Sequence, residues 1–295
     1  MRTVVITTGG LGTRLLTYTK VNPKTMLPIY EKSNDRNPNP VVRPLIEYIF
    51  ENLYDNGFRK FCFIVGAKTK SSIICHLNPD KKYVQLLKKR NLPEDKRFIR
   101  TLSQLEKKVN SCDISWISQA TPMGFGHALL SASKFVGSDK FLLHAGDVYF
   151  PSYGFMSQFV NRHNMTKNVS STLLLQYKKS LKGYGIAQVR RDNGENIVFH
   201  VEEKPQKPLS NLVILPLYIF EPIIFNALRN TTRGHNGELQ VTDAIKTLID
   251  WKKRIIGFDY GHKTWFDIGS PQNYFLALAY SFKKSIRREK YSMVG

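Results

Sequence analysis

Apolar and polar residues follow two different periods along the first half of the chain. Short continuous apolar runs, typical of buried strands, alternate with longer stretches in which apolar residues recur every three or four positions. The predicted strands are residues 3–8, 60–65, 113–118 and 141–145. The predicted helices are residues 44–56, 126–135 and a lysine-rich stretch, 68–110, interrupted at Asn78-Pro79 and Leu92-Pro93. Strands that alternate with helices predict a mostly parallel sheet with right-handed crossover connections.

The second half of the chain contains more predicted strands than helices. The strands are residues 171–176, 186–189, 198–201, 213–220 and 255–259, and the helices are residues 240–251 and 271–282. Pro216 lies inside one of these strands, where a proline predicts a bulge or an edge position. Since no stretch has the composition of a linker, we expect one domain, residues 1–282, with two lobes that meet near residue 150. A basic tail, residues 283–295, would follow it.

The charge of the chain limits the classes of partner. The chain has 295 residues, with 44 lysines and arginines against 23 aspartates and glutamates, and a formal net charge of +21. Such a balance fits either a nucleic-acid-binding protein or a soluble enzyme with anionic substrates. The cations are dispersed, with short runs such as Lys88-Lys89-Arg90, and aromatic residues do not interleave with them. We therefore favour anionic small molecules over nucleic acid.

Three further features concern the location of the protein. No apolar run approaches the ~18 residues that a membrane-spanning helix needs, and the first residues lack the layout of a signal peptide. The three cysteines, Cys62, Cys75 and Cys112, are scattered and form no CxxC pair. We expect a cytoplasmic protein without a membrane partner.

A glycine-rich turn follows the first predicted strand and has the chemistry of a phosphate site. Gly9, Gly10 and Gly12 let the backbone approach a ligand closely, and exposed N–H groups there can bind oxyanions. Arg14 and Lys24 add a planar cation and a point charge for phosphate oxygens. The turn matches neither the GxGxxG dinucleotide loop nor the P-loop. Taken alone, it could equally be an ordinary strand-to-helix turn with a solvent-facing arginine.

The glycine turn is one of several motifs that occur in a fixed order. The segments are Gly9–Arg14 with Pro23-Lys24, Gln119–Ala128, Gly146-Asp147, Tyr184-Gly185, Glu202-Glu203-Lys204-Pro205 and Trp265–Gly269. Together, from about residue 3 to residue 280, they resemble the sugar-1-phosphate nucleotidyltransferases. Gly124–Ala128 and Gly237–Ala244 are most similar to the corresponding segments of the bacterial-type uridylyltransferases that act on UTP and glucose 1-phosphate.

The resemblance implies a fold and a reaction. The fold would be a Rossmann-like α/β fold of the nucleotidyltransferase (glycosyltransferase-A-like) type, a mostly parallel or mixed sheet flanked by helices. The first lobe would bind the nucleotide and the second the sugar. The reaction would be uridylyl transfer from UTP to glucose 1-phosphate, giving UDP-glucose and pyrophosphate with Mg²⁺ as cofactor. The sugar phosphate itself attacks the α-phosphorus, so positioning and charge neutralisation would supply most of the catalysis.

The resemblance also implies roles for individual residues. Arg14, Lys24 and Asp147 would be catalytic, and Asp147 and Asp267 would hold Mg²⁺. The nucleotide-binding residues would be Thr8, Gly9, Gly10, Gly12, Thr13, Arg14, Lys24, Gln119, Pro122 and Gly124. The sugar-phosphate-binding residues would be Gly146, Tyr184, Gly185, Glu203 and Lys204. Gln119 would offer a donor and an acceptor to the base edge that uracil and thymine share.

Other interpretations of the same residues stay open. Asp147 and Asp267 could cap a turn or a helix, and Lys204 could be a surface lysine beside a proline turn. We expect His127, at a predicted helix start, to pack or cap rather than to act in catalysis. We expect the tryptophans in the core; they are Trp116, Trp251 and Trp265.

Three residues depart from the family pattern. Thr8 stands where the glycine loop usually has alanine, Thr17 where it usually has proline, and Pro216 where thymidylyltransferase relatives have glycine. The sugar end of the site is therefore undefined by sequence. A thymidylyltransferase, another sugar-1-phosphate nucleotidyltransferase and a nucleotide-sugar-binding protein without turnover are the alternative functions. We also expect a homo-oligomer.

Overall fold

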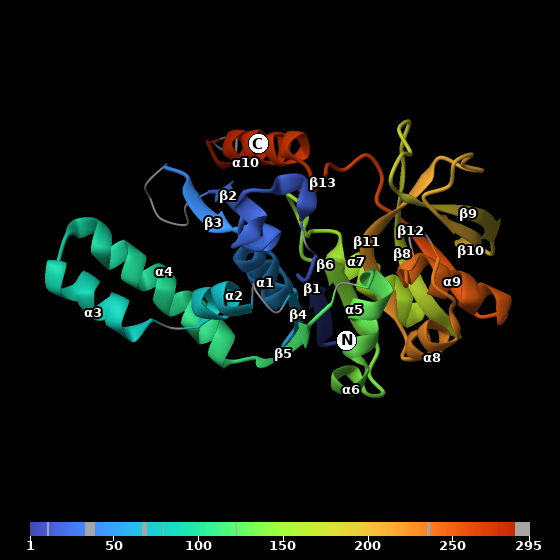
Figure 1. Cartoon of the computed structure of the whole chain (residues 1–295), viewed down its shortest axis with the longest axis horizontal. Coiled ribbons are helices and arrows are strands. Elements are labelled where there is room, and N and C mark those ends of the chain that lie inside the picture. The colour runs from blue at the N-terminus through green and yellow to red at the C-terminus, as the bar shows by residue number, and fades with distance from the viewer. Residues whose placement is uncertain are drawn as a thin grey trace, which may run out of the picture.

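A computed structural model describes residues 1–10, 12–32, 39–66, 70–78, 80–121, 123–234 and 237–286. Its centre is a nine-stranded sheet in the order β5-β4-β1-β6-β11-β8-β12-β10-β9 (Figure 1). The four strands from the first half are β1 (Thr3–Thr7), β4 (Lys60–Gly66), β5 (Asp113–Gln119) and β6 (Phe141–Ala145). They are parallel, with Thr3 opposite both Lys60 and Phe141. The predicted parallel sheet of this half is confirmed.

The second half adds its strands to the same sheet and makes it mixed. These strands are β8 (Val169–Tyr177), β9 (Gly185–Asp192), β10 (Glu195–Glu203), β11 (Leu212–Phe220) and β12 (Arg254–Asp259). Strand β11 is antiparallel to both β6 and β8, whereas β12 is parallel to β8. The β6–β11 pairing joins the halves of the chain, so one sheet positions residues from both.

Pro216 lies in an irregular part of β11. Ile214 pairs with Leu175 and Tyr218 pairs with Leu173, so Leu215, Pro216 and Leu217 lie opposite the single residue Leu174. Because proline has no N–H to donate to a ladder, an interior strand accepts it at such a bulge. The bulge expected from the sequence is confirmed.

Helices cover both faces of the sheet. They are α1 (Leu45–Asp55), α2 (Lys70–Leu77), α3 (Lys81–Arg90), α4 (Pro93–Asn110), α5 (Phe125–Ser131), α6 (Ser133–Val136), α7 (Met156–Met165), α8 (Ile223–Asn230), α9 (Val241–Asp250) and α10 (Pro271–Ile286). The lysine-rich stretch forms α2, α3 and α4, and the latter two extend from the body as an arm (Figure 1). The predicted helix over residues 126–135 is in fact two, because the chain turns at Ala132.

The central strands are apolar on both faces because both faces are covered. Val4 and Ile6 of β1 pack into one hydrophobic core, while Val5 between them packs into the other. All three side chains are completely buried. Burial of each such side chain contributes about 1.5–3 kcal/mol, which explains the continuous apolar runs in these strands.

Two small sheets complete the fold beside the ends of the central strands. Strand β2 (Pro28–Glu31) pairs with β3 (Val41–Pro44), and β7 (Val148–Tyr149) pairs with β13 (Phe266–Asp267). The second pairing sets Asp267 opposite Val148, directly after the end of β6. Ligands of open α/β sheets bind beyond the carboxyl ends of the strands, and this pairing brings a late chain segment to that edge.

Two expectations about the later part of the chain need correction. Helix α10 continues to Ile286, so Lys283 and Lys284 belong to a helix rather than to a tail; residues 287–295 lie outside the described part. Trp251 is 39% exposed at the end of α9, not buried in the core. Within the described residues, none of the helices combines the length and the apolar character that crossing a membrane would require.

Candidate active site

A cavity of about 660 Å³ opens at the carboxyl ends of β1, β5 and β6. The predicted site residues that line it are Thr8, Gly9, Gly10, Gly12, Thr13, Arg14, Lys24, Gln119, Gly124, Asp147, Tyr184, Gly185, Glu203, Lys204 and Asp267. Gly146 packs behind the wall instead, where its N–H donates to the Thr7 carbonyl at 2.9 Å. Pro122 lies outside the described residues. Tertiary structure therefore gathers residues that span most of the chain.

The glycine turn after β1 is shaped by contacts at Gly12. This residue has φ 63° and ψ 30°, a left-handed conformation that glycine adopts without strain. Its carbonyl accepts a bond from Thr19 Oγ1 at 2.9 Å. A Cβ at this position would lie 2.8 Å from Thr19 Cγ2 and 2.9 Å from Lys24 Cγ. The turn and the Lys24 side chain therefore pack together only around a glycine.

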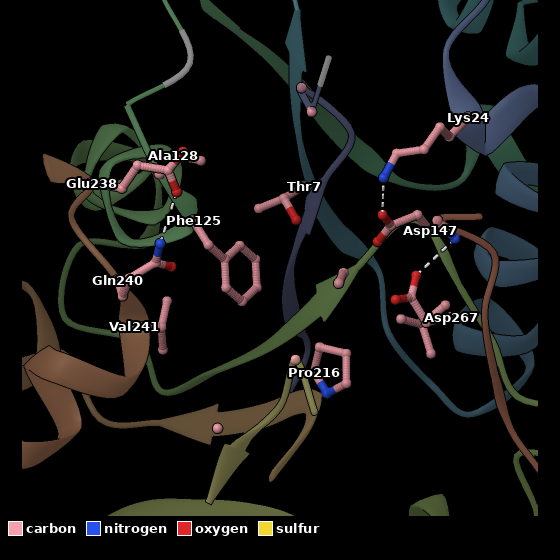
Figure 2. Close-up of a pocket in the computed structure, with 18 of the residues that line it drawn as sticks. Thr7, Lys24, Phe125, Ala128, Asp147, Pro216, Glu238, Gln240, Val241 and Asp267 are labelled. Atoms are coloured by element: carbon pink, nitrogen blue, oxygen red, sulfur yellow. Dashed lines mark hydrogen bonds and ion pairs between the residues drawn. The ribbon is translucent and has the colours of Figure 1, made fainter. Parts of the chain in front are cut away.

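The wall of the cavity carries an ion pair. Lys24 begins a single 3₁₀ turn, Lys24–Met26, and its ammonium donates to Asp147 Oδ2 (Figure 2). The Lys24 and Asp147 side chains are 13% and 28% exposed, so the pair is shielded yet open to a ligand. Asp147 lies two residues after the end of β6, which places the carboxylate at the sheet edge.

Arg14 and Asp267 meet at Gly269, next to this pair. A Cβ on Gly269 would lie 2.6 Å from an Arg14 guanidinium nitrogen and 2.8 Å from Asp267 Oδ1. The Gly269 N–H donates to Asp267 Oδ1 at 2.8 Å and orients the carboxylate. Two cations and two carboxylates thus share one end of the cavity, and Figure 2 shows Asp147 and Asp267 side by side.

The two carboxylates differ in their affinity for protons. Burial raises the pKa of Asp147, but the charge and hydrogen bond of Lys24 outweigh burial and hold that pKa below its usual range. Burial and then the negative charge of Asp147 raise the pKa of Asp267. In the free protein, the nearby cations therefore do not offset the effects of burial and of the Asp147 charge on the Asp267 carboxylate.

This arrangement fits a divalent cation that keeps several ligand positions for phosphate oxygens and water. Mg²⁺ is typically held by one or two carboxylates together with substrate phosphates. Asp147 and Asp267 supply two such carboxylates, and the raised pKa of Asp267 shows that a cation there would relieve repulsion. Elsewhere in the described residues, no cluster of three or more acidic, histidine or cysteine side chains offers an alternative cage.

Gln119, the last residue of β5, also lines the cavity. Its Nε2 lies 3.0 Å from His127 Nδ1, and a Cβ on Gly9 would lie 3.1 Å from its Oε1. The amide therefore lies between the glycine turn and helix α5. His127, expected only to pack or cap, is in contact with a side chain that lines the cavity.

Glu203, at the end of β10, also lines the cavity. Thr242 Oγ1 donates to Glu203 Oε2 at 2.6 Å, and Lys204 Nζ lies 3.1 Å from Glu203 Oε1. A Cβ on Gly185 would lie 3.1 Å from Thr242 Oγ1 and 3.2 Å from Glu203 Oε2. A carboxylate held from two sides is a precise acceptor for hydroxyl groups of a ligand.

Lys204 has an unusual backbone conformation. Its φ is 45°, in the left-handed region that few residues other than glycine adopt, and its N–H donates to the Tyr184 carbonyl at 3.2 Å. Such strain is found preferentially at functional sites, where surrounding structure maintains it. Lys252, an exposed lysine after α9, also has a left-handed backbone, with φ 59°. The contact with Glu203 and the position on the cavity wall therefore distinguish Lys204 from an ordinary surface lysine.

An aromatic wall lies beside Lys204. The Tyr184 and Trp265 rings meet edge-on with centroids 5.7 Å apart, and both line the cavity. Lys178 Nζ lies 4.3 Å from the Trp265 ring centroid, and burial lowers the pKa of this lysine. Trp265 is thus both largely buried and part of the site. Trp116, expected in the core, is half-buried and stacks on Phe63 at the edge of the core.

Several cavity residues had no role in the sequence prediction. Besides Trp265 they include Phe125, Pro216, Glu238, Gln240, Val241 and Thr242 (Figure 2 labels most of them). Residues 238–242 belong to a motif visible in the sequence, and the start of α9 carries them into the cavity. That motif was the available signal for these residues. For Pro216 the signal was its departure from the family pattern, which had already connected it with the sugar end of the site.

Comparisons with known proteins agree with this arrangement. The model of the nucleotidyl transferase family matches residues 3–283. The chain belongs to the nucleotidyl transferase family. The motifs from the glycine turn to Asp267 all lie within the matched residues of this nucleotidyl transferase.

Relatives of this nucleotidyl transferase cover nearly its whole length. The UTP–glucose-1-phosphate uridylyltransferase of Bacillus subtilis is 33% identical over 276 residues, 91% of this chain and 87% of the relative. That of Mycoplasma pneumoniae is 29% identical over 291 residues, 97% and 94% of the two chains.

Solved structures agree with the fold. A UDP-glucose pyrophosphorylase complexed with UDP-glucose is 25% identical, with a TM-score of 0.80 over 96% of this chain and 99% of that one. The UTP-bound UGPase of Acinetobacter baumannii is also 25% identical, with a TM-score of 0.78 over 95% and 93%. The nucleotidyltransferase fold is confirmed.

Proposed function

We propose that this nucleotidyl transferase transfers a uridylyl group from UTP to glucose 1-phosphate. The observation that carries the proposal is the convergence of Arg14, Lys24, Asp147 and Asp267 on the wall of one cavity. Gln119, Glu203 and Lys204 line the same cavity. Relatives whose names state this activity, and solved relatives bound to UTP or UDP-glucose, support it.

The reaction joins two anions, so the cations carry most of its chemistry. An oxygen of the sugar phosphate forms a bond to the α-phosphorus, the bond from that phosphorus to the bridging oxygen breaks, and pyrophosphate leaves. Arg14 would bind the β- and γ-phosphates and the departing pyrophosphate, and Lys24 would bridge the α-phosphate and the attacking phosphate. Such fixed charges stabilise the transition state without reorganisation.

The remaining residues would place the two substrates. The base would lie on Gly9 and Gly10 against Gln119, while Gly185 and Glu203 would contact sugar hydroxyls. Lys204 would separate from Glu203 and bind the sugar phosphate. Asp147 and Asp267 would hold Mg²⁺, which supplies positive charge to the phosphates when bound.

A pyrophosphate-release assay tests the proposal. The protein is incubated with Mg²⁺, each nucleoside triphosphate in turn and each common hexose 1-phosphate. We expect the greatest release with UTP and glucose 1-phosphate. Equal or greater release with dTTP would replace the uridylyl assignment by a thymidylyl one. No release with any pair would indicate a binding protein without turnover.

Two further properties are part of the proposal. All three cysteines are free thiols, which supports a reducing, cytoplasmic location. The homo-oligomer stays a prediction, and size-exclusion chromatography with light scattering would test it.

A further inference from the structure

The Gln119 side chain is held in one orientation by His127. Its amide nitrogen lies 3.0 Å from His127 Nδ1, and an amide nitrogen can only donate. Nδ1 must therefore accept, which requires a neutral imidazole with its proton on Nε2. Gln119 is 7% exposed, so losing this bond would leave a buried polar group without its partner.

His127 is itself positioned by the backbone around it. The Gly126 N–H donates to the Leu239 carbonyl at 2.8 Å, and the Leu239 N–H donates to the Met123 carbonyl at 3.0 Å. A Cβ on Gly124 would lie 2.5 Å from the Leu239 oxygen. The start of α5 is thus packed tightly against the segment before α9, which fixes the backbone of His127 next to Gln119.

The orientation of the amide decides what Gln119 presents to a base. With Nε2 on His127, Oε1 lies on the side of Gly9, where the proposed function places the base. An outward oxygen accepts from the N3–H of uracil. Cytosine carries a lone pair at N3, which the same oxygen would repel. The flipped amide would suit cytosine, but it would set Oε1 against the Nδ1 lone pair unless the imidazole also moved its proton from Nε2 to Nδ1. The proposal therefore depends on the tautomer with its proton on Nε2.

We propose that His127 is a positioning residue that selects uracil over cytosine by fixing the orientation of the Gln119 amide. The inference rests on the proposed function for the identity of the reaction. Thymine has the same edge as uracil, so the pair does not separate UTP from dTTP. His127 acts only through Gln119 and does not touch the substrate.

Two variants of His127 test the proposal. His127→Phe keeps a ring without an acceptor, and His127→Asn restores an oxygen close to the position of Nδ1. For His127→Phe we expect the ratio of kcat/KM for UTP to that for CTP to fall about tenfold, equivalent to about 1.4 kcal/mol. The change should lie in KM for the nucleotide, with KM for glucose 1-phosphate unaltered. In His127→Asn, KM for UTP should return close to the value of the unaltered enzyme.

The outcomes distinguish this proposal from the proposed function. If the unaltered enzyme releases no pyrophosphate, calorimetry can still measure the affinities of UDP and CDP for the unaltered protein and for His127→Phe. That comparison tests the contact between His127 and Gln119. The tautomer of His127 can be measured by ¹⁵N NMR of the unaltered protein. A proton on Nδ1 would overturn the proposal. So would a UTP-to-CTP ratio in His127→Phe that equals the original one. The NMR measurement needs no variant, so a folding defect in His127→Phe does not weaken the test.

Discussion

Individual charged residues of the site neutralise one another in the free protein, and substrates would have to separate them. Lys24 is paired with Asp147, and Lys204 with Glu203. Binding of two anionic substrates with a divalent cation would transfer each lysine to phosphate and Asp147 to the metal. Removal of Lys24 or Asp147 therefore leaves its partner without its counter-charge in a shielded site, which costs more than the loss of a surface ion pair does.

The first prediction at this scale concerns Asp147. Asp147→Asn keeps the size of the side chain but removes the charge that faces Lys24 and the proposed metal. We expect kcat in the pyrophosphate assay to fall by roughly 10²–10³, as for loss of one group that stabilises transition-state charge. The circular dichroism spectrum should be unaltered. Asp139→Asn is the matched control, because Asp139 forms its ion pair with Lys60 on the surface. Near-normal turnover of Asp147→Asn would remove this residue from the active site.

The second prediction uses the strained backbone of Lys204. Lys204→Gly and Lys204→Ala both remove the ammonium, so kcat/KM for glucose 1-phosphate should fall by about 10² in each. Only glycine is relaxed at φ 45°, and the glycine variant should be more stable than the alanine variant by about 1 kcal/mol. Chemical denaturation measures the difference. Equal stability would show that the left-handed conformation carries no cost here, and unchanged kinetics would show that the ammonium does not bind the sugar phosphate.

Among the elements, short turns shape the site more than long helices do. Arg14 and Lys24 each lie in a single 3₁₀ turn, Thr13–Leu15 and Lys24–Met26, and Gly12 connects β1 to the first of them. These turns lack the burial that makes helices stable, so close packing between them keeps their side chains in place. The contact of Gly12 with Lys24 is the clearest case.

The third prediction tests this packing. Gly12→Ala introduces a Cβ 2.8 Å from Thr19 Cγ2 and 2.9 Å from Lys24 Cγ, as well as backbone strain at φ 63°. We expect a destabilisation of about 2–3 kcal/mol and a large loss of kcat, since Lys24 must move. Gly194→Ala is the control: its φ is 80°, but nothing lies within 4 Å of the new Cβ. It should show only the strain, about 1–2 kcal/mol, and full activity. Full activity in Gly12→Ala would contradict this account of the turn.

Elements with a strong hydrophobic period were predictable, and elements without one were not. The buried strands β1, β4 and β6 appear in the sequence as continuous apolar runs, within one residue of the observed bounds. Strands β7 and β13 contain two residues each, too few to show a period. Helix α7 has few apolar residues, so its stripe was too weak to recognise.

The stability of the whole molecule is linked to pH through a histidine in its central strand. His144 of β6 is completely buried, with Nδ1 donating to the Ala145 carbonyl and Nε2 accepting from the Tyr153 hydroxyl, each at 2.7 Å. Burial lowers the pKa of His144 from 6.5 to about 4. Because the unfolded state binds this proton more readily, the contribution of neutral His144 is complete above pH 6.5 and lost as pH falls toward 4.

The fourth prediction gives this linkage a size. Between pH 7.5 and 4.5 the protein should lose about 2.5 kcal/mol through His144, in addition to any loss from its carboxylates. The double variant His144→Phe/Tyr153→Phe removes the titrating group without leaving an unpaired hydroxyl. Its free energy of unfolding should depend on pH less steeply by that amount. Urea denaturation at both pH values measures the free energy of unfolding of the two proteins. If it changes with pH by the same amount in both, His144 does not couple folding to protonation.

Motifs in the sequence predicted residues on the wall of the site but not how they contact one another. The sequence marked Arg14, Lys24, Asp147 and Asp267 through their motifs, and the cavity contains all four. It could not show that Thr242 holds Glu203, because this contact joins segments 39 positions apart that meet only in the folded sheet. Nor could it show that His127 contacts Gln119, because that depends on how the chain turns between β5 and α5. The roles of the wall residues in catalysis stay predictions until the variants are measured.

The sequence by itself determined the family, the strands with continuous apolar runs and the chemical types of the site residues. These are local properties, since hydrophobic period and motif spacing need no partner across the fold. Tertiary structure alone decided that β11 joins the two halves of the chain, that β13 carries Asp267 to the end of β6, and that the bulge at Pro216 faces the cavity. Those arrangements arise from strand pairing and burial between distant segments, which no single stretch of residues encodes.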